Sequence, residues 1–126
     1  MPANETTGSG PAWVPDTGAP MTANEYIGAY LAHPDLWWWT TNLSTEPRGS
    51  VLSRVLAIIM QANVVVHEKA LGQLGAGPLE DMMSDELLDE LQVLHPFSPA
   101  LKLALSCVRV GTETARVRER LAAMLR

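Results

Sequence analysis

The residue types that most often catalyse reactions or bind metals are sparse in this chain and widely spaced. Its histidines, His33, His67 and His95, do not stand four residues from one another or from the single cysteine, Cys107, as two ligands on one helix face would. His67 and Glu68 are adjacent, and adjacent helical residues diverge by about 100°, so they form a poor metal pair. We therefore predict no catalytic residue, no metal ligand and no cofactor.

A dense group of acidic residues is the first feature that could recognise a partner. Between positions 80 and 90, six of eleven residues are Asp or Glu and none is Lys or Arg. Like charges four residues apart on a helix, such as Asp85 and Asp89, repel by about 0.2–0.5 kcal/mol per pair. Such a face is either simply solvated or a docking surface that steers a basic partner. The predicted docking residues are Glu80, Asp81, Asp85, Glu86, Asp89 and Glu90.

Three consecutive tryptophans, Trp37, Trp38 and Trp39, are the second such feature. Three successive helical side chains fan over about 200°, so one face cannot bury them all. Either neighbouring helices enclose the tryptophans or at least one indole faces outward, and tryptophan is enriched in the energetic centres of protein interfaces. We include all three among the predicted partner-binding residues.

The elements that must hold these residues are predicted to be helices. Thr22-Ala-Asn-Glu25 forms a capping box, and Ser84 and Ser98 stand at the starts of further segments with helical apolar periodicity. An almost wholly apolar helix is expected from about residue 47 to 62, where Ser50, Arg54 and Gln61 leave a polar stripe.

Glycines and prolines are expected to separate the later helices. Gly75-Ala-Gly-Pro78 should break one helix and place Pro78 in the first turn of the next. A glycine-rich turn before a helix can cradle phosphate, but this one lacks a lysine, and Glu80 and Asp81 would repel an anion. We expect Gly111 to end the helix that Ser98 begins and Thr112 to cap the last one.

Together these elements predict a single all-α domain over residues 21–126. Six to seven short helices joined by short turns suit either a small orthogonal bundle or a short helical-repeat-like stack. Residues 1–20 are predicted to be a disordered tail, because eleven of them are Pro, Gly, Ser or Thr.

Charge is distributed unevenly along the chain. Residues 1–90 hold three basic and twelve acidic residues, a net charge of −9, whereas residues 91–126 carry +4. The arginines of the last helix could pack against the acidic helix, and an acidic body disfavours nucleic acid and favours a basic protein partner. The apolar run at residues 55–60 is far shorter than the ~20 residues that span a bilayer. A lone cysteine suits a reducing compartment, so we expect a cytoplasmic protein without a membrane partner.

The segment Leu74-Gly-Ala-Gly-Pro-Leu-Glu-Asp-Met-Met83 resembles a signature of a family of small, uncharacterised bacterial helical proteins. The family pattern reads roughly Leu-Gly-Ala-Gly-Pro-Leu-Glu-Asp-Leu-Leu, so Met82 and Met83 replace two leucines here. The resemblance covers about residues 45–110 and implies a bacterial origin, an α fold and cytoplasmic residence, with no activity to carry over. In its small size and acidity the chain is also similar to the immunity proteins that neutralise bacterial toxins.

These observations predict a non-catalytic protein-binding domain. Its most concrete form is an immunity protein that occludes the active surface of a basic toxin. An alternative is a structural or adaptor subunit of a larger or homo-oligomeric assembly that associates through the tryptophans. A third option is a small enzyme whose site is assembled from Arg54, His67 and Glu68.

Overall fold

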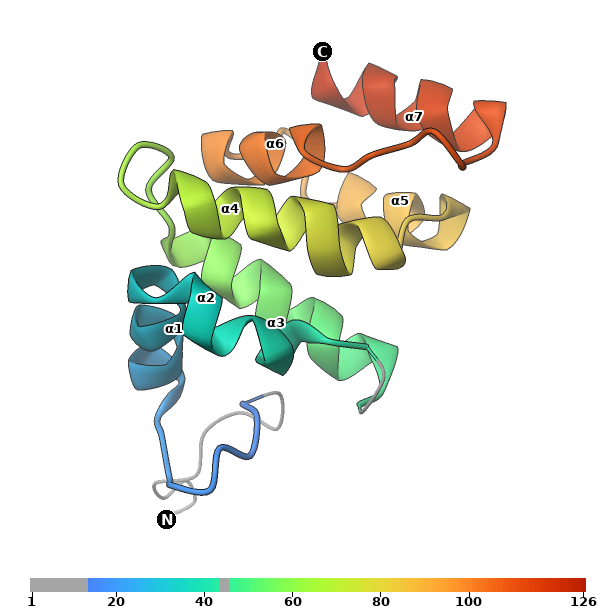
Figure 1. Ribbon diagram of the computed structural model, residues 1–126. Coiled ribbons are helices and arrows are strands. Elements are labelled where there is room, and N and C mark those ends of the chain that lie inside the picture. Colours follow the sequence, from blue (N-terminus) through green and yellow to red (C-terminus); the bar gives the residue numbers. More distant parts are fainter. Residues whose placement is uncertain (1–13, 44–45) are drawn as a thin grey trace.

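Helices form all the regular structure of the described chain, which confirms the all-α prediction (Figure 1). The computed structural model describes residues 14–43 and 46–126, and these ranges contain no β-strand. Two of the elements are not α-helices, since η1 is a 3-10 turn and η2 a π-helical segment. The elements are α1 (Ala23–Ala32), α2 (Pro34–Trp37), η1 (Trp38–Thr41), α3 (Arg48–Gln61), α4 (Glu68–Leu74), η2 (Gly75–Leu79), α5 (Asp85–Gln92), α6 (Pro99–Ser106) and α7 (Ala115–Leu125).

The helices form a small bundle around α3, α4 and α6. Helix α4 passes into η2 without a break, and this rod packs against α6 and α3 (Figure 1). Helices α1 and α2, with η1, lie at the N-terminal end of the bundle, whereas α7 lies on α5 and α6 at the other end. Because α2 contacts α4 and η1 contacts α3, the tryptophan segment lies against two of the three central helices. Within the described ranges, no helix is long and apolar enough to cross a membrane.

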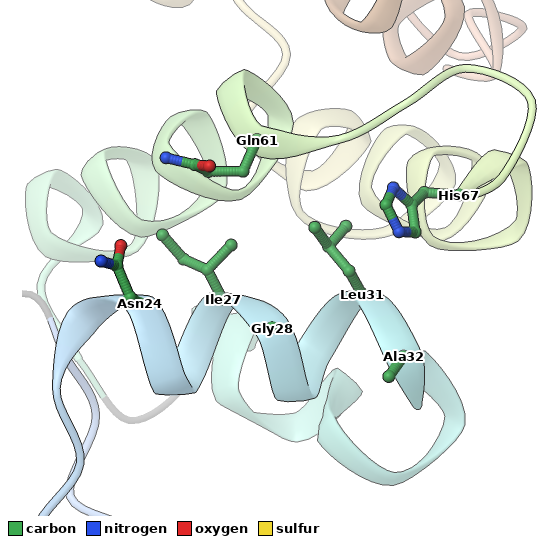
Figure 2. Close-up of a pocket in the computed structure, with 7 residues that line it drawn as sticks. All are labelled: Asn24, Ile27, Gly28, Leu31, Ala32, Gln61 and His67. Atoms are coloured by element: carbon green, nitrogen blue, oxygen red, sulfur yellow. The ribbon is translucent and has the colours of Figure 1, made fainter.

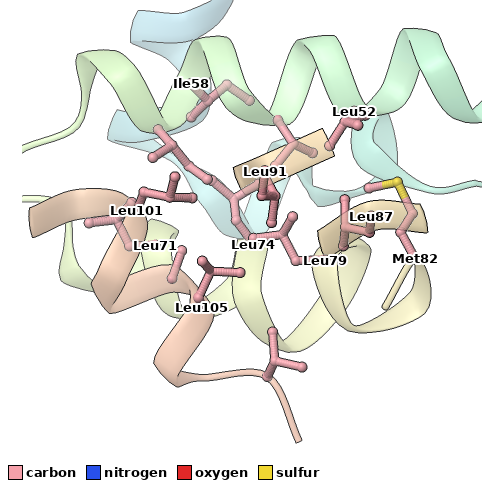
Figure 3. Packing of buried hydrophobic residues seen from close by; sticks show 14 of the residues in the cluster. Leu52, Ile58, Leu71, Leu74, Leu79, Met82, Leu87, Leu91, Leu101 and Leu105 are labelled. Atoms are coloured by element: carbon pink, nitrogen blue, oxygen red, sulfur yellow. The ribbon is translucent and has the colours of Figure 1, made fainter. Parts of the chain in front are cut away.

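Leucines fill the centre of this bundle. Figure 3 shows Leu71 and Leu74 of α4 gathered with Leu101 and Leu105 of α6 and with Leu91 of α5. Burying one such side chain contributes about 1.5–3 kcal/mol relative to leaving it exposed. This shared cluster therefore fixes the central helices against one another.

Three predicted helix starts are confirmed. The capping box is complete, since the Thr22 N–H donates to Glu25 Oε1 at 2.8 Å and the Glu25 N–H donates to Thr22 Oγ1 at 3.1 Å. The Ser84 and Ser98 hydroxyls each accept the backbone N–H three residues further on, at 3.1 and 3.2 Å. These side chains satisfy donors that the first turn of a helix leaves without a partner.

The predicted boundary at Gly111 and cap at Thr112 are wrong. Helix α6 ends at Ser106, and the chain then turns, with the Glu113 N–H donating to the Val110 carbonyl oxygen at 3.1 Å. This turn delays the last helix by two residues, so that Thr114 caps α7.

The prediction that Gly75–Pro78 separates two helices is also wrong. Helix α4 continues into η2, and Pro78 lies inside that helical segment. A proline ring clashes with the preceding α-turn and has no N–H to donate, and the wider π-turn relieves this conflict. Gly75 has a packing role instead, because a Cβ there would collide with the backbone carbonyl of Ala104 and lie 3.0 Å from the Cβ of Cys107.

The predicted tail is only partly within the described chain, because residues 1–13 lie outside it. Pro15 is buried, and Val14 packs half-buried against the core. In the described chain, packing therefore begins before Met21, because Val14 and Pro15 place apolar surface against the helices.

Candidate partner-binding site

The three tryptophans have different surroundings. Trp37 is half-buried and packs edge-on against Tyr26, with ring centroids 6.1 Å apart. Trp39 stacks on Trp37, at 6.4 Å between centroids and 20° between planes, yet 46% of Trp39 is exposed. Trp38 is 53% exposed and the neighbouring Leu36 68% exposed. Two of the three indoles therefore face solvent; we call Leu36, Trp38 and Trp39 the tryptophan surface.

Hydrogen bonds from the buried side hold this segment in place. The Thr40 hydroxyl donates to the Trp37 carbonyl oxygen at 2.6 Å and lies 2.7 Å from the Tyr26 hydroxyl. On the α4 side, Gln73 Nε2 donates to the Pro34 carbonyl oxygen at 3.0 Å. These bonds fix the backbone on both sides of the tryptophans, so the exposed indoles stand on an ordered scaffold.

Arg54 is the deepest of these anchors. The sequence placed it on a polar stripe, but its side chain is completely buried. Its guanidinium donates to the Thr40 carbonyl oxygen and, in a bidentate arrangement at 2.7 and 2.6 Å, to the Glu46 carboxylate. The hydrogen bonds from Arg54 lower the pKa of Glu46, against the opposing effect of burial. The arginine is therefore committed to the fold, and it does not line the pocket that contains His67.

The acidic residues are mostly neutralised within the chain. Five of the six predicted docking carboxylates form ion pairs with arginines of the described residues, and these arginines come from three separate parts of the chain. The pairs are Glu80–Arg109 (2.9 Å), Asp85–Arg116 (3.1 Å), Asp85–Arg120 (2.9 Å), Asp89–Arg120 (2.7 Å), Glu86–Arg48 (3.3 Å) and Glu90–Arg48 (2.6 Å). The basic last helix thus packs its charges against the acidic helix.

Asp81 is the exception among the six. It is exposed, and in the described part of the chain no lysine or arginine forms an ion pair with it. Asp81 and Trp38 both line a pocket of about 210 Å³ between η1 and the α4–η2 rod. The remaining lining residues are Thr41, Asn42, Gln73, Gly77 and Pro78.

The structure thus brings together Trp38, from the tryptophan run, and Asp81, from the acidic group, at one pocket. The other predicted partner-binding residues do not line this pocket. Gln73 and Asn42 could not be identified from the sequence, because a single amide in a helix or turn has no spacing that marks it. Glu46 was equally hard to identify, because the sequence does not reveal that Arg54 is buried.

A second pocket, of about 440 Å³, contains the one histidine that the enzyme option invoked. Figure 2 shows Ile27 and Leu31 of α1 projecting toward Gln61 and His67. His67 Nδ1 accepts the backbone N–H of Asn63 at 2.9 Å, so this nitrogen stabilises the turn before α4. The lining residues include no carboxylate, cysteine or arginine that could act with the imidazole.

Neither the ligand chemistry nor the comparisons assign this site to a known class. In residues 14–43 and 46–126, no group of three or more His, Cys, Asp or Glu side chains is arranged to hold a metal ion. Comparison with protein-family models, with curated proteins and with solved structures finds no match to this chain. The resemblance carried by residues 74–83 therefore stays a prediction, and function must be argued from the geometry.

Acid should weaken the fold through carboxylates whose pKa values are lowered by hydrogen bonds. They are Glu46 (to Arg54), Glu80 (to Arg109), Asp85 (to Arg120) and Glu25 (to the backbone of Thr22). With a lowered pKa in the folded state, each group contributes stability above its unfolded-state pKa of about 4 and loses it as pH falls through the folded-state pKa. Thermal melts should show a melting temperature that is steady down to about pH 5 and falls below it.

Matched variants test the source of this acid sensitivity. Glu80→Gln and Asp85→Asn together should reduce the decline in melting temperature between pH 5 and pH 3, because two of the groups no longer titrate. An unchanged decline in that double variant would show that other groups control the acid response.

Proposed function

We propose that this protein is a non-catalytic protein-binding domain that docks on its partner through the tryptophan surface. The observation that carries the proposal is the exposure of Trp38 and Trp39 on a segment whose backbone is held by hydrogen bonds from its buried side. The other aromatic side chains described outside the tryptophan run, except histidines, are buried: Tyr26, Tyr30 and Phe97. Exposed tryptophans held in place suit interface anchors, because little side-chain freedom is lost on binding.

The charge pattern supports a revised location for the docking contact. Carboxylates that already pair with arginines at short range produce a weak electrostatic field outside the protein. The acidic helix should therefore attract a basic partner less strongly than its sequence suggests. Asp81, next to the tryptophan surface, is the carboxylate best placed to meet a partner's positive charge. The most concrete form of the proposal remains an immunity protein that covers the active surface of a basic toxin, on the general likeness to such proteins.

Affinity capture from native cells, with a paired variant as bait, tests this proposal. The Trp38→Ala/Trp39→Ala variant should lose a stoichiometric partner that the unchanged protein retains. One such anchor contributes about 2 kcal/mol, so we expect the affinity for the isolated partner to fall at least about 30-fold. Because the contact is largely apolar, the partner should remain bound at high salt.

The matched control is Met60→Ala/Val93→Ala, which removes two other exposed apolar side chains, 83% and 82% exposed. Capture that is equally strong with both double variants would contradict the proposal. A partner lost at high salt but indifferent to the tryptophans would return the contact to the acidic helix. A concentration-dependent mass that only the tryptophan variant abolishes would make the partner a second copy of this chain.

A further inference from the structure

The pocket between Trp38 and Asp81 has a chemistry that the tryptophan surface alone does not have. Trp38 of η1 lines the pocket together with Gly77 and Pro78 of η2. Asp81 supplies a carboxylate, and Gln73 and Asn42 supply amides. An aromatic face, a negative charge and neutral polar groups thus meet in about 210 Å³.

The hydrogen bonds around the pocket leave one amide acceptor available for a ligand, in addition to the Asp81 carboxylate. Both N–H groups of the Gln73 amide are used, one by the Tyr30 hydroxyl and one by the Pro34 carbonyl oxygen, each at 3.0 Å. Its amide oxygen, for which the described chain provides no donor, is therefore the polar atom left for a ligand. The Thr41 hydroxyl hydrogen is likewise committed, because it donates to the Trp38 carbonyl oxygen at 2.9 Å.

One amide oxygen and one carboxylate beside a tryptophan match a planar cation rich in donors. A guanidinium has five N–H donors and no acceptor, stacks on aromatic faces and pairs with carboxylates in two-point contacts. An ammonium also attracts both groups, but it cannot stack and donate in a plane at the same time. A phosphate or carboxylate ligand would meet Asp81 and the acceptors with the wrong sign.

We propose that this pocket binds an arginine side chain of the partner protein, with its guanidinium stacked on Trp38 and paired with Asp81. The inference rests on the proposed docking function and names the chemistry of the residue that is recognised. Asp81 is suited to this role because it is exposed and, unlike Asp85 and Glu80, forms no short-range ion pair with an arginine of the described chain. Arg109, which pairs with Glu80, feels the charge of Asp81 only at longer range.

Titration with N-acetyl-arginine amide, followed by nuclear magnetic resonance, tests the pocket directly. The Trp38 indole N–H and the Gly77 backbone N–H should shift together and saturate at millimolar concentrations, because one side chain makes few contacts. The citrulline analogue keeps the shape but lacks the charge, and it should bind at least about tenfold more weakly. N-acetyl-lysine amide should bind several-fold more weakly than arginine.

Two isosteric variants locate the charge. Asp81→Asn should weaken arginine binding by about tenfold, because it removes the charge-assisted pair and leaves the volume unchanged. Glu119→Gln removes the same charge from an exposed position on α7 and should bind arginine as the unchanged protein does. The amide spectra of both variants report whether the fold is retained.

The remaining outcomes overturn the inference. They are the absence of saturable shifts at Trp38 and Gly77, equal binding of citrulline or lysine, or equal weakening by Glu119→Gln. Failure of the pocket is distinct from failure of the docking proposal. If arginine amide does not bind but the tryptophan variant still loses its protein partner, docking stands and arginine recognition is rejected.

Discussion

Replacing Gly75 with alanine should lower the free energy of unfolding by about 3 kcal/mol, although the change adds a single methyl group to a helical segment. The reason lies in the contact between η2 and α6. The new Cβ would occupy the space of the Ala104 carbonyl group and also approach the Cβ of Cys107. Both obstacles are fixed close to the backbone, so the helices must separate, and the leucine cluster between α4 and α6 loses contact.

Gly77→Ala is the matched control, because Gly77 lies in the same π-helical segment and a Cβ there would meet no other part of the fold within 4 Å, apart from its chain neighbours and the nearby helix backbone. In a helix, alanine is favoured over glycine by roughly 0.5–1 kcal/mol, and the steric restriction that Pro78 places on the residue before it opposes this gain. This variant should therefore change the free energy of unfolding by less than about 1 kcal/mol. Urea unfolding followed by circular dichroism measures both. Similar midpoints for the two variants would show that α6 does not depend on the close approach at Gly75.

The same contact shows where sequence reasoning reaches its limit. The local signals in Thr22–Glu25, Ser84 and Ser98 predicted helix starts correctly, because a cap and the N–H group that it accepts lie within a few residues. The glycines at 75 and 77 look alike in sequence, and a break was the natural prediction for both. The packing difference between them comes from α6, about thirty residues further along the chain, which approaches Gly75 and not Gly77.

The candidate site was predictable to a similar degree. The sequence identified the tryptophans and the acidic group as unusual, and it allowed the basic last helix to neutralise acidic residues. It could not place Arg48 against Glu86 and Glu90, because that pairing depends on how α3 crosses α5. The pocket beside Trp38 could not be predicted from the sequence for the same reason. Gln73 and Asp81 line it because α4 continues into η2, and this continuity was not predicted.

The second large effect is expected at Glu46. Glu46→Ala should lower the free energy of unfolding by about 3 kcal/mol, even though the Glu46 side chain is 31% exposed. Its removal takes away the carboxylate that pairs in two points with the guanidinium of Arg54, which is fully buried, and a buried charge that loses its ion-pair partner costs far more than a lost surface contact. The effect should also reach the site, because Arg54 holds the carbonyl of Thr40 beneath the tryptophans.

A double-mutant cycle separates this mechanism from simple loss of a contact. Arg54→Met should cost about 2 kcal/mol, because the Thr40 carbonyl loses a donor, and adding Glu46→Ala to it should cost little more. Lys69→Ala, which breaks the exposed pair with Asp35, should change stability by less than about 1 kcal/mol. Strictly additive costs for Glu46 and Arg54 would mean that the buried guanidinium finds other compensation. Sub-additive costs, with altered tryptophan fluorescence in Glu46→Ala, would tie the buried ion pair to the order of the docking surface.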